Sequence, residues 1–401
     1  MNVPKIKDLR EVAVVTGKDY TGKWNVYGTD LGVAVYVPSQ KRMYFLFGDT
    51  IGEWEVDKTK PKKWRGCVAG YTENLDFSEG IKWDGFLDDE EGNARELVVS
   101  HHKSFPHYEV SKITQGGIEI DGNIYFFYES IHHWGPAGSG LWYLNYGGVI
   151  KSSDGGKTFE KVHDLTWVEP THDPQLRDNA ARIAAEDLYG NPTGMEFDAK
   201  LHAAPGFGQT FATDGKDGYI YIYGRLGGRV SGIKCGRVKK EDFERFDAYE
   251  YITGIDEDGN VIWKPYREGL DEIIKNPVDA EIVKGPTSNM SVQYNEYLGK
   301  WLLTFYRQRT GIFYCVSDTP YGPYTEPTLA IDFFDPRLRR EIEENKQHGN
   351  CLYGGFTHEM MNREGGKIVP IVISQWYART DPENPDIKRF YGSRLYEIEF
   401  E

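Results

Sequence analysis

The stretch Ile118-Glu119-Ile120-Asp121-Gly122-Asn123-Ile124-Tyr125-Phe126-Phe127-Tyr128 has an apolar or aromatic run on each side of Asp-Gly. Alternation of side chains with a period of two indicates β-strands, because successive residues of a strand face opposite sides of a sheet. Asp-Gly between two such runs favours a type I′ turn, whose twist matches that of the flanking strands. The sequence therefore predicts a β-hairpin over residues 118–128.

Four further segments follow the same plan, with two strand-like runs joined by a polar turn. They occupy residues 31–47, 211–223, 290–306 and 360–374. Their turns are centred near residues 39, 216, 297 and 364, so that with the turn near 122 the centres lie 83, 94, 81 and 67 residues apart. Similar hairpins at roughly even spacing are typical of radial repetition. We predict an all-β fold, a five-bladed β-propeller formed by residues 1–401 as a single domain.

Two segments interrupt this pattern. Residues 178–188 begin with Asp178, a residue suited to capping a helix, and end near Gly190. Residues 336–347 are rich in Arg and Glu. We expect both to be short helical insertions between blades. A pair of β-sandwiches is the alternative architecture, and the absence of a linker rich in Pro, Gly and Ser argues against it.

The charge of the chain bears on its partners. Its 401 residues carry a formal net charge of −15, from 47 Lys and Arg against 62 Asp and Glu. Nucleic acids and anionic membrane surfaces bind clustered cations, and no apolar run approaches the ~18 residues of a membrane-spanning helix. We expect no nucleic-acid partner and no membrane insertion. The sequence leaves the oligomeric state open.

Motifs of several common activities are absent. The chain has no G-x-x-x-x-G-K-[ST], G-x-S-x-G or H-E-x-x-H motif, and no G-x-G-x-x-G after a strand. The adjacent histidine pairs at 101–102 and 132–133 would project to opposite faces of a strand, so they do not suit one metal ion. The four cysteines are far apart, and we expect free thiols. No metal ligands are assigned and no cofactor is required.

Two aspartates of the first hairpin could act together. Asp30 lies at the start of its first strand and Asp49 at the end of its second. A turn at 38–41 would return both to the same edge of the sheet, several Å apart. Glycoside hydrolysis uses such a carboxylate pair, one as the acid and the other as base or nucleophile. The alternative is that each aspartate caps a turn beside its glycine.

The segment Ser152–Phe159 matches the Asp-box pattern S-x-D-x-G-x-x-[WF], which resembles the structural turns of sialidase-like propellers. The block Gly28–Thr50, with Asp30 and Asp49, resembles the domain-of-unknown-function 4185 family, which is linked to endo-D-arabinofuranosidases of glycoside hydrolase family 183. The similarity covers nearly the whole chain, through Thr16-Gly17, Trp64–Ala69, Gly80–Trp83, 117–125, 133–135, the Asp-box, 291–301 and 317–324. The last of these segments also resembles five-bladed glycosidases of the arabinanase type, family 43. Two departures from the family are insertions near 173–195 and 332–348.

The resemblance implies a five-bladed propeller with its site at one mouth of the central channel. It implies that Asp30 and Asp49 are the catalytic pair, without saying which is the acid. Arg65 is a candidate for keeping one carboxylate charged. Related propeller glycosidases can carry calcium, so a structural calcium ion is compatible with the resemblance, although no ligand spacing requires one.

Other polar or aromatic residues lie near strand ends that would face the channel. For each of them, turn capping or an ordinary buried hydrogen bond is the alternative. The substrate-binding candidates are Arg65, Gln115, Glu129, Trp134, His202, Gln209, Asn289 and His358, with Glu359 beside the last. Trp54, Trp64, Trp134 and Trp376 are candidates for stacking on sugars, and aromatic residues, 14% of the chain, also suit strands.

These observations predict a glycoside hydrolase that cleaves furanosidic linkages of a polysaccharide, acting within chains of D-arabinan. The alternatives are a non-catalytic glycan-binding propeller and a hydrolase of another glycan, such as L-arabinan or a sialoside. No apolar leader is visible at the N-terminus. We expect a secreted or periplasmic protein whose leader has been removed, with a cytoplasmic protein as the alternative.

Overall fold

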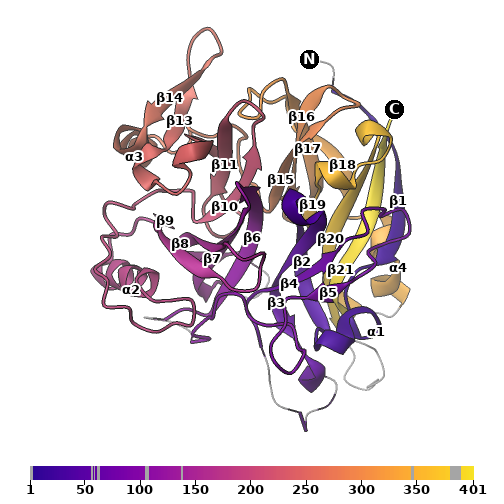
Figure 1. Ribbon diagram of the computed structural model, residues 1–401. Coiled ribbons are helices and arrows are strands. Elements are labelled where there is room, and N and C mark those ends of the chain that lie inside the picture. Colours follow the sequence, from indigo (N-terminus) through magenta and orange to yellow (C-terminus); the bar gives the residue numbers. More distant parts are fainter. Residues whose placement is uncertain are drawn as a thin grey trace.

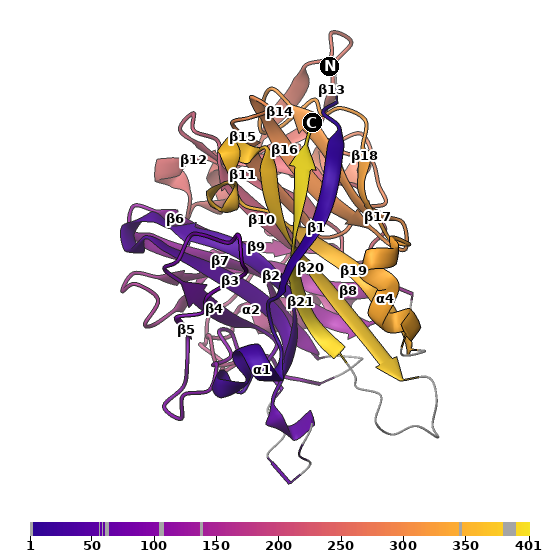
Figure 2. The same ribbon diagram turned by 90° about the vertical axis from the view of Figure 1, so that its right-hand side faces the viewer.

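The computed structural model describes residues 3–55, 57, 59–60, 64–103, 108–136, 139–344, 347–379 and 390–401. Five antiparallel sheets are arranged radially as the blades of a five-bladed β-propeller (Figures 1 and 2). The predicted all-β propeller is therefore confirmed. Within the described part of the chain, no helix has the length and apolar character needed to span a bilayer.

Each of blades 1 to 4 places its first strand nearest the centre, and the next strands follow outward. Blade 1 contains β2 (Gly28–Val37), β3 (Arg42–Ile51), β4 (Val68–Thr72) and β5 (Gly85–Phe86), and blade 2 contains β6 (Ser111–Ile120), β7 (Asn123–Trp134), β8 (Trp142–Ser152) and β9 (Glu160–Val168). Blade 3 has a fifth strand: β10 (Gln209–Asp214), β11 (Tyr219–Arg225), β12 (Lys234–Lys239), β13 (Glu250–Ile255) and β14 (Val261–Pro265). Blade 4 contains β15 (Met290–Asn295), β16 (Lys300–Arg307), β17 (Gly311–Ser317) and β18 (Thr328–Asp332).

Blade 5 closes the ring with both ends of the chain. From the centre outward it contains β19 (Gln347–Phe356), β20 (Ile368–Arg379), β21 (Phe390–Phe400) and β1 (Ile6–Val14). The first strand thus pairs with the last, from Ile6 opposite Phe400 to Val14 opposite Arg394, and the two termini lie near each other (Figure 2). The N-terminal strand thus supplies the outermost strand of a blade whose other strands are C-terminal, and this pairing closes the ring.

The turns follow from local sequence. In the hairpin between β6 and β7, Asp121 and Gly122 both have positive φ, 50° and 80°, as the predicted type I′ turn requires. In the Asp-box, Ser152 Oγ accepts a hydrogen bond from the Gly156 amide at 2.8 Å, and Asp154 accepts one from the Thr158 amide at 2.9 Å. These bonds make the Asp-box a structural turn between β8 and β9.

Both expected helices are present with different bounds, and one expected strand was wrong. The helix expected at 178–188 is α2 (Pro174–Ala184), because Asp173 caps it by accepting from the Gln175 amide at 2.8 Å. The second helix, α4, spans Pro336–Glu344, and Gln347 already belongs to β19. The expected inner strand at 360–361 is a 3₁₀ turn, Glu359–Met361, and β19 is the inner strand of blade 5 instead.

The remaining helices are α1 (Lys18–Thr21) and α3 (Tyr266–Lys275), and 3₁₀ turns occur at 22–24, 38–40, 53–55, 240–242, 246–248, 359–361 and 364–366. Helix α3 was not anticipated from the sequence. The core fills the spaces between blades: Tyr44 of blade 1 packs edge-on against Phe126 of blade 2, with ring centroids 5.8 Å apart. Cys67, Cys235 and Cys315 are buried free thiols, whereas the side chain of Cys351 lies outside the described part.

Candidate active site

Asp30 and Asp49 are brought together by an irregularity in the first hairpin. The β2–β3 pairing runs regularly up to Thr29 opposite Thr50, and its register shifts between that pair and Leu31 opposite Phe47. Leu31 adopts a positive φ of 70° within the shift, which marks a bulge, a feature that re-aims side chains next to active sites. Both aspartates lie in this bulged segment, and the charge of Asp30 acts on Asp49.

Asp30 is held between two tyrosines of blade 5. The Tyr353 hydroxyl, on β19, donates to Asp30 Oδ2 at 3.1 Å, and the Tyr391 side chain, on β21, also hydrogen-bonds to Asp30. Burial raises the pKa of Asp30 to about 6, against the opposing effects of both tyrosines and of Arg229. Its Oδ1 is buried and has no hydrogen-bond partner among the described residues, so this oxygen has an unused acceptor position.

Asp49 has a different environment. Ser111 Oγ, at the start of β6, donates to Asp49 Oδ1 at 2.6 Å, and the Trp64 side chain also hydrogen-bonds to this carboxylate. Burial and then the charge of Asp30 raise the pKa of Asp49 to about 7, whereas Ser111, His102 and Trp64 oppose the rise. The charge of Asp30 thus favours the protonated form of Asp49, whereas Tyr391, Tyr353 and Arg229 favour the ionised form of Asp30. Carboxyls with different pKa values divide the acid and base roles in this way.

A third carboxylate, Glu129 on β7, accepts three N–H bonds. Gln115 Nε2 and Gln209 Nε2 donate to its Oε1 at 2.9 and 3.3 Å, and Trp142 Nε1 donates to its Oε2 at 3.1 Å. Burial raises the pKa of Glu129 to about 7, while Arg225 lowers it and Asp30 raises it. Because donors occupy both oxygens, Glu129 is best suited to act as an acceptor that fixes its neighbours.

The glutamines extend this cluster to blades 3 and 4. Gln209 Nε2, at the start of β10, donates to Gln115 Oε1 at 2.7 Å, and Asn289 Nδ2, just before β15, donates to the same oxygen at 3.4 Å. All of these side chains are buried. Four of the predicted binding residues, Gln115, Glu129, Gln209 and Asn289, therefore meet beside the aspartates.

Arg65, His202 and His358 lie outside the cluster. Arg65 donates to the carbonyls of Ala94 and Asn25 at 2.9 and 2.6 Å, and Glu96 and Asp89 are the charges that act on its pKa. Its guanidinium therefore holds loops of blade 1 and does not bond to either aspartate.

His202 stacks on Phe246 with centroids 4.5 Å apart, and its Nδ1 lies 3.0 Å from the Thr166 carbonyl. His358 follows the end of β19, where its Nδ1 accepts from the Met360 amide at 3.1 Å. Burial, with the nearby Lys216 ammonium, lowers the pKa of His358 to about 4. Lys216 follows the end of β10 and pairs with Glu359 at 2.8 Å, so His358 lies at the opposite end of the inner strands from the carboxylates.

Three of the ten tryptophans are exposed, and each one lies next to a carboxylate or to a residue that bonds to one. Trp64 is 40% exposed and bonds to Asp49. Trp134 is 44% exposed and packs edge-on against Trp142, the partner of Glu129, at 6.3 Å. Trp376 is 38% exposed and pairs across strands with Tyr391, the partner of Asp30. The fourth candidate, Trp54, is half-buried.

Several functional neighbours were missed from the sequence. They are Ser111, Trp142, Arg225, Arg229, Tyr353 and Tyr391. Ser111 and Arg225 stand at the ends of strands, as the predicted residues do, and that position could have singled them out. Tyr353 is 323 residues from Asp30 along the chain, and nothing in its local sequence distinguishes it from the other tyrosines.

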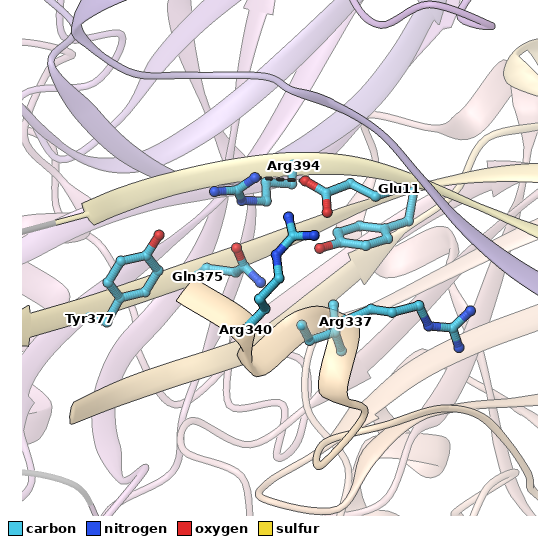
Figure 3. A pocket seen from close by; sticks show the side chains of 8 residues that line it. Glu11, Arg337, Arg340, Gln375, Tyr377 and Arg394 are labelled. Atoms are coloured by element: carbon cyan, nitrogen blue, oxygen red, sulfur yellow. Dashed lines mark hydrogen bonds and ion pairs between the residues drawn. The ribbon is translucent and has the colours of Figure 1, made fainter. Parts of the chain in front are cut away.

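Hollows of the described surface are lined by residues other than these aspartates. A space of about 10 Å³ is lined by Glu11, Arg337, Leu338, Arg340, Gln375, Tyr377, Arg394 and Tyr396 (Figure 3), and a void of that size holds about one water molecule. Hollows of about 420 to 530 Å³ flank α2, away from the aspartates. No cluster of three or more His, Cys, Asp or Glu suited to a metal ion occurs among the residues that the structure describes.

The family model named Domain of unknown function (DUF4185) matches residues 16–393. The chain belongs to the DUF4185 family. No curated protein matches this DUF4185 chain. Among solved structures, a Bacteroides ovatus protein of proposed hydrolase function shares 14% identity and a TM-score of 0.53, over 94% of this chain and 87% of the other. This likeness shows a common fold.

Two further likenesses have lower TM-scores. The Bacillus subtilis arabinanase Arb43A shares 13% identity at a TM-score of 0.44, over 92% of this chain and 96% of its own. An α-L-arabinofuranosidase from Clostridium thermocellum shares 11% identity at a TM-score of 0.42, over 90% and 94% of the two chains. For this DUF4185 protein, the functional argument rests on its own residues.

Proposed function

We propose that this protein is a glycoside hydrolase that cleaves furanosidic linkages within a polysaccharide, with D-arabinan as the substrate. The observation that carries the proposal is the Asp30–Asp49 pair, two carboxyls on adjacent strands whose pKa values are raised to about 6 and about 7. Perturbed carboxyls that interact with each other in a partly open site mark acid–base chemistry. Glycoside hydrolysis is a reaction that uses such a pair without a cofactor.

The two aspartates take different steps. Protonated Asp49 gives its proton to the glycosidic oxygen as the C1–O bond breaks. Ionised Asp30 faces the developing oxocarbenium ion and takes a proton from the attacking water, whose oxygen forms the new bond to C1. An ester formed on Asp30 would instead preserve the anomeric configuration, so the configuration of the first product distinguishes the two routes.

The exposed tryptophans support a polymeric substrate. Trp64, Trp134 and Trp376 come from three blades; Trp64 bonds to Asp49, and the other two lie beside Trp142 and Tyr391, which bond to Glu129 and Asp30. Aromatic faces bind the apolar faces of sugars, and an exposed tryptophan provides a large contact area. Three separate surfaces suit several consecutive sugar units of one chain, which favours cleavage within the polymer.

The experiment is product release from a panel of D-arabinan, L-arabinan and a sialylated glycan, analysed by chromatography of the products. Oligosaccharides of mixed length from D-arabinan alone would support the proposal in full. Release of sugars from L-arabinan or the sialoside instead would support glycosidase activity and would reject D-arabinan as the substrate. Binding of a glycan by the folded protein without any release would replace the enzyme with a glycan-binding propeller.

A further inference from the structure

Arg229 lies in the loop between β11 and β12 of blade 3. Hydrogen bonds hold the backbone of this loop in place. The buried guanidinium of Arg225 donates to the carbonyl oxygens of Leu226 and Gly228, and the Leu226 amide donates to Ser231 Oγ at 3.0 Å. These bonds tie the loop backbone on both sides of Arg229. The position of its side chain is therefore set by the fold of the loop.

Three aromatic rings from three other blades surround the Arg229 guanidinium. The centroids of Trp142, Tyr306 and Tyr353 lie 5.5, 5.3 and 5.9 Å from its central carbon. Cations at such distances from aromatic faces are attracted by the ring quadrupole, more strongly when desolvated. The Nε of Arg229 donates to Ser288 Oγ at 3.2 Å, which orients the plane of the guanidinium.

Two walls of this cage also contact the acidic residues. The Tyr353 hydroxyl donates to Asp30 and the Trp142 indole donates to Glu129. Arg229 therefore packs against the residues that orient two carboxylates, and its own charge acts on both of them. One side chain from blade 3 thus connects carboxylates of blades 1 and 2.

Several groups act on Asp30 from the surrounding elements. Tyr353 and Tyr391 donate to it from blade 5, and Arg229 supplies a positive charge from blade 3. Asp49 on β3 and Glu129 on β7 are the neighbouring acids, and each has its pKa raised by Asp30. When both acids are charged, they favour protonation of Asp30, and the cation opposes this effect.

We propose that Arg229 is the positioning cation of this site: it keeps a negative charge on Asp30 and, through Tyr353 and Trp142, fixes Asp30 relative to Glu129. The inference rests on the proposed hydrolysis for its purpose, because a base must be ionised when substrate binds. Its geometry can be tested without turnover. Without Arg229, Asp30 would face two other acids without the positive charge that Arg229 supplies, and would hold its proton to higher pH.

The test is a pH titration of the protein labelled with ¹³C at the aspartate carboxyls, followed by NMR, with the Asp30 signal identified by its loss in Asp30→Asn. The variant Arg229→Met should raise the midpoint of Asp30 by one pH unit or more. Arg229→Lys, which keeps the charge, should shift it less. Arg229→Gln, whose amide can still reach Ser288, replaces the Met variant if that does not fold.

A matched control is Arg237→Met. Arg237 also lies over two rings, Tyr219 at 4.7 Å and Trp263 at 4.1 Å, and pairs with Glu250 at 2.7 Å. Arg237 is thus enclosed by aromatic rings in the same way, but on the outer part of blade 3. Its replacement should therefore leave the titration midpoint of Asp30 unchanged. An unchanged Asp30 midpoint in the neutral Arg229 variants, or an equal shift in Arg237→Met, would overturn the proposal.

The pH dependence of turnover gives a second test, which is independent of the NMR titration. In Arg229→Met the acid limb of the pH profile of kcat/KM should shift to higher pH by the same amount as the Asp30 midpoint. At each pH unit below that midpoint, kcat/KM should fall about tenfold. A purely structural role would lower the whole profile equally. If wild type cleaves no glycan while the NMR shift is present, the proposed function fails and the role of Arg229 in holding the charge survives.

Discussion

Replacing Asp49 with Asn should stabilise the folded protein at alkaline pH while it abolishes activity. Asn keeps the shape of the side chain and an oxygen that can accept from Ser111, but it removes a charge that the fold disfavours. The pKa of Asp49 rises from 3.8 to about 7 on folding. At about 1.36 kcal/mol per pKa unit, a shift of that size corresponds to at most about 4 kcal/mol. Because Asp49 is partly open to solvent, we expect a gain of about 1–3 kcal/mol.

The sign of the effect depends on pH. At Asp49 the folded state binds more protons than the unfolded chain between about pH 4 and pH 7, so the contribution of this group to the free energy of unfolding falls as pH rises through this range. Above pH 7 the charge of Asp49 exerts its full destabilising effect. The difference between Asp49→Asn and wild type should therefore be largest at pH 8 and disappear near pH 4.

The assay is chemical denaturation of both proteins at pH 4, 6 and 8, with product release measured on the same samples. Asp154→Asn is the control of opposite sign, because hydrogen bonds from Thr158 and Ser152 lower the pKa of Asp154 to about 2. That variant should lose stability at pH 8. If Asp49→Asn is less stable than wild type at pH 8, or if it is equally active, the environment described for Asp49 is wrong.

Three further predictions concern the same site. Activity should follow a bell-shaped pH profile with its optimum between about 6 and 7, since Asp30 must be ionised and Asp49 protonated; a profile that rises steadily to pH 9 would contradict this assignment. Gly48→Ala should abolish activity and destabilise the protein by about 1–3 kcal/mol, because its Cβ would lie 2.7 Å from Asp30 Oδ1 and 3.0 Å from Ile113 Cγ2; circular dichroism melts and turnover measure both effects, and wild-type values would refute the close packing. Trp134→Ala should raise KM for a long D-arabinan chain about tenfold and leave the hydrolysis of an aryl furanoside unchanged; equal losses on both substrates would show that Trp134 supports the fold and not an outer sugar site.

The sequence predicted the elements that depend on local pattern. The Asp121-Gly122 turn, the first four hairpins and the Asp-box turn all follow from a few adjacent residues, and the structure contains each of them. Asp30 and Asp49 belong to one hairpin, so their proximity also follows from a local turn. The inner strand of blade 5 was missed because Gly354 and Gly355 have positive φ, and the resulting irregularity in β19 breaks the alternation by which strands are recognised.

The rest of the site depends on closure of the ring. Tyr353, Tyr391 and Arg229 reach Asp30 only because blades 3 and 5 meet blade 1 around the axis. A single sequence gives no information on which of its 27 tyrosines does so. His358 was misplaced for a related reason: the inner strand of blade 5 lies before it in the chain and not after it, so the residue falls at the other end of the channel.

The most direct test of the central claim compares wild type with Asp30→Asn on D-arabinan, with sugar binding measured by calorimetry and product release by chromatography. The account predicts that the variant binds D-arabino-oligosaccharides as wild type does, or more tightly, and releases products at a rate lower by a factor of about 10³ or more. Equal product release from both proteins would contradict it, because Asp30 would then have no part in the chemistry.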